Sequence, residues 1–99
     1  MIANLNRGEA IIKLDDKPYK LCLTMGSLAK IENAFALNEF SQIEEKFQNL
    51  KANDLILLVA ILLEGGQNPV EIEYLKTAKV DLGDITRAII NCFSLNLGD

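Results

Sequence analysis

Residues 7–35, RGEAIIKLDDKPYKLCLTMGSLAKIENAF, are the stretch that decides the fold of this chain. Polar and apolar side chains alternate in residues 9–14 and again in residues 19–24, and this period of two is typical of strands that bury one face. The polar connection between them, Asp-Asp-Lys-Pro at 15–18, favours a turn. Residues 9–24 are therefore predicted to form an antiparallel β-hairpin. Its apolar face is expected to consist of Ala10, Ile12, Leu14, Tyr19, Leu21 and Leu23.

An isolated hairpin is only marginally stable in water, so its apolar face needs a cover. The helix predicted directly after it supplies one, because Thr24 is suited to cap a helix that carries Leu28, Ile31 and Phe35 on one side. Capping residues and helical spacing predict helices over 25–37, 42–50, 54–64, 69–76 and 82–96. The expected fold class is α+β and mostly α, with an N-terminal antiparallel β-hairpin packed on a small bundle of about five short helices.

The ends of the third predicted helix, 54–64, carry clear signals. Asn53 or Asp54 is expected to cap its start. Gly65-Gly66 is expected to supply the left-handed backbone with which helices commonly end.

Length and composition indicate one domain over residues 1–99, since 99 residues with 49% apolar content suffice for a single core. The net charge of -4 argues against binding phosphate backbones, which needs clustered Lys and Arg, so we expect no nucleic acid partner. The first residues lack a secretory signal pattern, and the longest apolar run, 55–63, is much shorter than the about 20 residues that cross a bilayer as a helix. We therefore expect a soluble, cytoplasmic protein without a membrane partner.

The sequence contains little that does chemistry. Histidine, the side chain most used for acid–base catalysis near neutral pH and the commonest metal ligand, does not occur. Cys22 and Cys92 lie far apart without metal-binding spacing, so buried thiols are expected. Asp15 and Asp16 are typical turn residues. We expect the protein not to be an enzyme, with no catalytic residue, no cofactor-binding residue and no metal ligand.

A small DNA-binding regulator is an alternative from another class, because several short helices can form a helix-turn-helix. The helices that would serve as readers, 69–76 and 82–96, offer together with the connection between them only Lys76, Lys79 and Arg87 for phosphate contacts. This alternative is therefore the weaker one.

The segment 55–63 is where a functional interpretation competes with a structural one. Every residue in it is apolar, so a helix here has no solvated side and must be enclosed by its own domain, by a partner, or by both. One stripe is expected to face the core, and a second stripe about 100° round the helix is available to a partner or a second copy. The candidate protein-interaction surface on this second stripe is Ile56, Val59 and Leu63. Full internal burial is equally compatible with the sequence.

Two blocks of the chain resemble a known family. The first is residues 7–35, with an Arg-Gly-Glu start, a strand, a polar turn, Tyr-Lys-Leu-Cys-Leu-Thr, and then the Leu-Ala-Lys-Ile-Glu-Asn-Ala-Phe helix. The second runs from Phe47 through Asp54-Leu55-Ile56 to Gly65-Gly66. Together they resemble the small gene transfer agent and phage-tail proteins of alphaproteobacteria, a family filed as tail assembly chaperones or as tail-tube-like proteins.

The resemblance implies a non-enzymatic role in building a phage-like tail, with other tail components as partners, in a gene transfer agent or a prophage. As a tail assembly chaperone, the protein would bind the tape-measure protein before tube assembly and shield its apolar stripes. As a structural tail-tube-like subunit, it would form a homo-oligomer, which normally takes a larger sheet. The chaperone is our prediction, and the tube subunit is the alternative.

Overall fold

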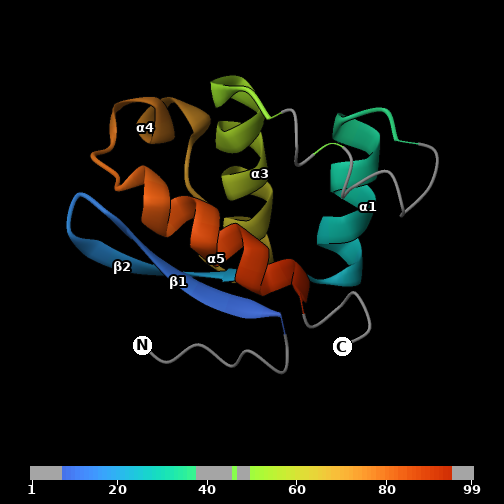
Figure 1. Cartoon of the computed structure of the whole chain (residues 1–99), viewed down its shortest axis with the longest axis horizontal. Helices are drawn as coiled ribbons and strands as arrows, with labels where there is room; N and C mark the ends of the chain where they lie inside the picture. The colour runs from blue at the N-terminus through green and yellow to red at the C-terminus, as the bar shows by residue number, and fades with distance from the viewer. Residues whose placement is uncertain (1–7, 38–45, 47–49, 95–99) are drawn as a thin grey trace.

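The computed structural model describes residues 8–37, 46 and 50–94 (Figure 1). Its elements in chain order are β1 (Glu9–Leu14), β2 (Lys17–Cys22), α1 (Met25–Ala34), α3 (Ala52–Gly65), α4 (Ile72–Thr77) and α5 (Leu82–Ser94). This order confirms the predicted α+β class, mostly helical, with an antiparallel hairpin at its start. The described ranges hold four helices rather than five, and the predicted helix 42–50 falls almost entirely outside them.

β1 and β2 form a two-stranded antiparallel sheet joined by Asp15 and Asp16. Both joining residues have positive φ, 52° and 67°, which is the backbone of a type I′ turn and matches the natural twist of the strands. The turn is therefore tighter than the predicted connection 15–18, and Lys17 and Pro18 already belong to β2.

One face of the hairpin carries the core, as the alternation predicts. Ala10 pairs with Leu21 across the sheet and Ile12 pairs with Tyr19, and of these four side chains only that of Tyr19 is half-buried rather than buried. α5 packs mainly on β1, α3 on β2, and α1 on α3. In Figure 1, α5 runs along the hairpin whereas α3 rises steeply from it. The largest fully buried side chains are Phe93, Ile12, Leu14, Leu21, Ile31, Leu58, Leu62, Leu63 and Cys92.

The C-terminal end of α3 meets the backbone of β2 end-on. A Cβ atom on Gly65 would lie 2.2 Å from the carbonyl oxygen of Cys22, and one on Gly66 would lie 2.1 Å from that of Lys20. These distances are far shorter than any van der Waals contact, so both positions have room for glycine only. Asn68 Nδ2 donates to the same Lys20 carbonyl oxygen at 3.2 Å and holds the corner in place.

The left-handed residue at the end of α3 is Gln67 and not a glycine. Gly66 has a φ of -83°, whereas Gln67 has a φ of 64°. The N–H groups of Gln67 and Asn68 donate to late carbonyl oxygens of α3 at 3.0 and 2.8 Å, which is the pattern of a Schellman motif. The prediction that Gly65-Gly66 supplies the left-handed exit is therefore wrong, because the glycines serve the close approach to β2 instead.

Side-chain caps explain where α1 and α3 begin. Thr24 Oγ1 accepts the N–H of Ser27 at 2.9 Å, as predicted for the start of α1. α3 begins at Ala52, earlier than predicted, because Lys51 is its N-cap and Asp54 Oδ2 accepts the Lys51 N–H at 3.0 Å. This hydrogen bond to the charged form is the main cause that lowers the pKa of Asp54.

Three other helix bounds differ from the prediction. α1 ends at Ala34 rather than at 37, because Ala36 adopts a left-handed φ of 54°. α4 begins at Ile72 rather than at 69, after an extended N-cap at Glu71. α5 is described to Ser94, and the predicted residues 95 and 96 lie outside the described ranges.

Asp15 ties the hairpin turn to the connection between α4 and α5. Its Oδ1 accepts the N–H of Lys79 at 2.9 Å, and its Oδ2 accepts the hydroxyl of Tyr74 at 3.0 Å. The Lys79 backbone hydrogen bond is the main cause that lowers the pKa of Asp15, and the bond to this carboxylate is the main cause that raises the pKa of Tyr74 to about 12. A residue that the sequence marks only as a turn residue therefore positions a distant connection.

Replacing Gly66 by Ala is expected to destabilise the fold by about 1–3 kcal/mol or more, because the added Cβ collides with backbone that has no flexible end to move aside. Gly26→Ala is the matched control, since a Cβ there would make only an ordinary 3.7 Å contact with Thr24 Oγ1. Urea unfolding of both variants is the measurement. Equal stabilities of the two would contradict the end-on contact.

Replacing Gln67 by Gly is expected to stabilise the protein by about 1 kcal/mol, because glycine adopts a left-handed backbone without the steric cost that a Cβ imposes. Gln67 is exposed, so the change removes little packing. Chemical denaturation of Gln67→Gly beside the parent protein is the measurement. A loss of stability would show that the side chain has a structural role of its own.

Replacing Asp15 by Asn is expected to lower the pKa of Tyr74 toward its ordinary value of 10.0. In the parent protein, the hydrogen bond of Tyr74 contributes to the free energy of unfolding in full below pH 10.0. This contribution is lost as the pH rises through about 12, the raised pKa of Tyr74 in the folded state. The Asp15 contribution is present above its ordinary pKa of 3.8 and is lost as the pH falls through the lowered pKa of the folded state.

Unfolding as a function of pH and NMR titration of the tyrosine rings measure both effects of Asp15→Asn. The variant should show a flatter loss of stability in acid. An unchanged pKa of Tyr74 in Asp15→Asn would rule out the tether as the cause of its shift.

Candidate protein-interaction site

The exposure of α3 changes along its length rather than around its circumference. Leu58, Leu62 and Leu63 in its later part are fully buried, whereas residues 55–57 near its start are half-buried. The end-on contact with β2 explains this gradient, because it encloses the C-terminal end of α3 between the hairpin and α1. The first half of α3 projects away from the sheet (Figure 1).

The predicted surface of Ile56, Val59 and Leu63 is therefore not an open face of the folded chain. Leu63 is 0% exposed and Val59 is 4% exposed, so both belong to the core. Ile56 is half-buried and keeps part of its side chain accessible. Contact between Ile56 and a partner stays a prediction.

Ile56 borders an apolar groove of about 190 Å³. The groove is formed by the end of β1, the first half of α3, α4, and the start of α5 with the connection before it. Every side chain that lines it is apolar: Leu14, Ala52, Leu55, Ile56, Val59, Leu75, Val80, Leu82 and Ile85. Val80 is 48% exposed and Leu82 is 62% exposed. Large exposed apolar side chains beside an apolar hollow are typical of a protein-binding site.

Polar contacts outside the groove hold its walls in place. Asp15 fixes the connection that leads to Val80. Asp81 Oδ1 accepts the N–H of Asp84 at 3.1 Å, which starts α5 and leaves Leu82 in its first turn. The groove is therefore preformed in the folded chain.

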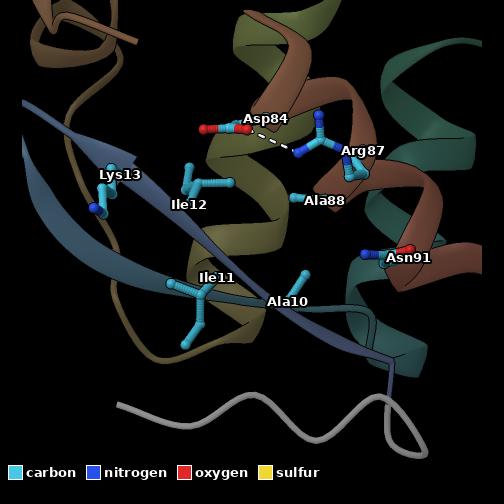
Figure 2. A pocket seen from close by; sticks show the side chains of 8 residues that line it. All are labelled: Ala10, Ile11, Ile12, Lys13, Asp84, Arg87, Ala88 and Asn91. Carbon is cyan, nitrogen blue, oxygen red and sulfur yellow. Dashed lines mark hydrogen bonds and ion pairs between the residues drawn. The ribbon is translucent and has the colours of Figure 1, made fainter. Parts of the chain in front are cut away.

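A second hollow, of about 530 Å³, lies between β1 and α5 (Figure 2). Its lining is mixed in polarity and consists of Ala10, Ile11, Ile12, Lys13, Asp84, Arg87, Ala88 and Asn91. Arg87 Nη1 donates to Asp84 Oδ1 at 2.8 Å, and Figure 2 shows this ion pair on the side of α5 that borders the hollow. The two hollows thus share α5 but differ in chemistry.

Sequence reasoning missed Val80 and Leu82 as surface residues. The available signal is Lys-Val-Asp-Leu at 79–82, in which large apolar residues alternate with charged ones at the end of a connection. Connections run over the surface, so an apolar residue within one is a hint of a binding site. Leu82 has the helical spacing of the buried Ile85, Ile89 and Cys92, a pattern that predicts a core residue, but the structure leaves it exposed.

The buried thiol of Cys92 stays protonated at neutral pH and is therefore not a reactive group. Burial is the main cause that raises the pKa of Cys92 to about 12, and Cys92 forms no disulfide with Cys22.

In the described ranges, no three His, Cys, Asp or Glu side chains gather closely enough to hold a metal ion. None of the helices in these ranges has both the length and the apolar character to cross a membrane.

Comparison with known proteins identifies the family. The family model described as "Phage tail tube protein, GTA-gp10" matches residues 7–97, which include the hairpin and every element that lines the two hollows. No curated protein and no solved structure matches the chain. The match supports the resemblance to gene transfer agent and phage-tail proteins that the sequence shows. Because it spans nearly the whole chain, the chain belongs to the family of phage tail proteins described as phage tail tube protein, GTA-gp10.

Proposed function

We propose that this protein is a non-enzymatic tail assembly chaperone that binds an apolar helical segment of the tape-measure protein in the groove between α3 and α5. Membership of a phage-tail family supports a role among tail components. The observation that carries the proposal is the groove itself, which is lined only by apolar side chains and flanked by Leu82 at 62% exposure. The expected place of action is the cytoplasm of the bacterial host, before the tube is built.

A helix is the partner shape that suits this groove. Its walls are mostly helical, and an amphipathic helix docks between such walls by inserting apolar side chains from successive turns. The groove is small, about 190 Å³, so it receives anchoring side chains rather than a whole helix. The exposed Val80 and Leu82 then extend the apolar contact beyond the groove.

The charge of the chain supports the same proposal. Before the tube assembles, long amphipathic helices expose apolar stripes, and exposed apolar stripes lead to aggregation. A binding domain with a net charge of -4 covers the stripe and adds a charged surface that keeps the complex in solution.

A structural tail-tube-like subunit is the second candidate, and the family description favours it. A tube subunit binds copies of itself into rings, so the groove would then receive a neighbouring copy of this chain. The two candidates differ in the partner that covers Leu82. An experiment that identifies this partner therefore distinguishes them.

The test of the chaperone is co-expression with the tape-measure protein of the same locus, comparing Leu82→Asp with Ile90→Asp. Both residues are exposed on α5, at 62% and 53%, but only Leu82 lines the groove. We expect Leu82→Asp to reduce the recovered complex by about tenfold or more, as for a central contact residue, and Ile90→Asp to leave it unchanged. Thermal unfolding of both variants should match that of the parent protein, since neither side chain is buried.

Two results would contradict the proposal. Equal loss of the complex in both variants would place the contact away from the groove. Assembly of the protein alone into rings, without recovery of a tape-measure complex, would support the tube subunit instead.

A further inference from the structure

β1 has an open edge. Leu14 and Lys17 flank a two-residue turn and form a hydrogen-bonded pair, so alternate residues of β1, counted back from Leu14, direct their backbone groups to β2. The N–H and C=O groups of Ile11 and Lys13 therefore point away from β2. No described residue forms a hydrogen bond with these groups.

The opposite edge of the sheet, along β2, is already covered. The carbonyl oxygen of Lys20 accepts Asn68 Nδ2 at 3.2 Å, and that of Cys22 accepts Ser27 Oγ at 3.4 Å. Pro18 has no N–H to satisfy, which is why proline is tolerated on an edge. Of the two edges in the described part of the chain, the edge of β1 is the one left open for another strand, at Ile11 and Lys13.

The open edge forms one wall of the hollow of about 530 Å³ in Figure 2. The other wall is a stripe of α5 with the spacing of one helical face, Asp84, Arg87, Ala88 and Asn91. A slot between a strand edge and a helix is the shape into which some recognition domains take an extended peptide. Its volume is within the range of about 300–1,000 Å³ that is usual for ligand sites.

We propose that this slot is a second binding site, in which an extended segment of a partner protein adds to β1 as a third strand. The open N–H and C=O groups of Ile11 and Lys13 lie in a row, and such a row is a template with which the backbone of an extended segment pairs in place of water. This site does not depend on the apolar groove or on the proposed chaperone function.

The occupant is a single segment of another protein rather than the β1 strand of a second copy. Paired strands lie about 4.8 Å apart. α5 packs mainly on β1, so pairing β1 with its copy would bring the two α5 helices toward the same spacing. Packed helices need about 8–10 Å between their axes. A segment that carries no helix of its own avoids this collision.

The charges beside the slot indicate an acidic segment. Lys13 forms no ion pair with any described residue, whereas the nearby Asp84 is already held by Arg87 at 2.8 Å. Asp81, the preceding acid, caps α5. Asp16 and Asp81 lie in a neighbouring hollow that Lys13 and Lys79 also line, but the slot itself carries Lys13 and Arg87 against Asp84 alone. A carboxylate on the added strand opposite Lys13 therefore meets a cation that has no ion-pair partner among the described residues, and Ala10 and Ala88 leave space for small or medium side chains on the face toward α5.

The test uses the full chain labelled for NMR and a synthetic peptide of alternating Glu and Thr, about ten residues long, with a Lys–Thr peptide as its counterpart. We expect the Glu–Thr peptide to shift the amide signals of Ile11 and Lys13 and to slow their hydrogen exchange. Lys13→Glu should weaken this binding by about tenfold and transfer the preference to the Lys–Thr peptide. Lys17→Glu, an exposed lysine of the other strand, is the matched control and should bind like the parent protein.

Binding of the Glu–Thr peptide by Leu82→Asp as tightly as by the parent would show that the edge acts independently of the apolar groove. The inference is overturned if neither peptide protects the Ile11 amide, or if Lys13→Glu and Lys17→Glu weaken binding equally. It is also overturned if the same amides become protected in a concentration-dependent dimer without peptide, since the edge would then belong to a second copy.

Discussion

The end-on contact between α3 and β2 is the constraint on which the rest of the structure depends. Gly65 and Gly66 allow the end of the helix to reach the carbonyl oxygens of Cys22 and Lys20. The helix therefore leaves the sheet steeply and does not lie along it (Figure 1). A helix that meets a sheet end-on buries the end in contact with the sheet, and its other end can be buried only by other elements. Among the described elements, α4 and α5 lie against the first half of α3 and bury it only in part. The apolar groove lies where these three helices leave apolar side chains accessible.

The fold was predictable from the sequence wherever the determining physics is local. Alternation of side chains identified the buried face of the hairpin almost residue by residue, and the hydroxyl of Thr24 identified the start of α1. The role of Gly65-Gly66 was not predictable in this way. A glycine pair after a helix is typical of a left-handed exit, and only the position of β2, many residues away in the chain, shows that the pair is there for a close approach. The role of Asp15 was not predictable for the same reason, because its partners Tyr74 and Lys79 are distant in sequence.

The candidate site was predictable only in outline. The lack of a solvated side drew attention to residues 55–63. A helical period, however, gives the angle of a side chain around the helix axis and not its position along the neighbouring elements. Leu63 was therefore assigned to a surface although it is fully buried, and Val59 is only 4% exposed although it lines the groove. Leu82 shares the helical spacing of the core residues of α5 and is nevertheless 62% exposed, because whether the first turn of α5 is covered depends on where α3 and α4 end.

α5 connects the two hollows, and its sequence shows how one helix can serve both. Its first turn presents Leu82 and Ile85 to the apolar groove, while Asp84, Arg87 and Asn91 face the slot beside β1. Apolar contact in a groove tolerates many partner sequences, because burial of apolar area is not directional. Strand addition is different, since backbone hydrogen bonds fix the direction and register of the added segment. A small apolar groove alone supports only modest binding, and a strand edge near it would add the direction that apolar contact lacks. On a domain of 99 residues, both kinds of contact are available because α3 meets the sheet end-on and, of the described helices, it is α5 that packs mainly along β1.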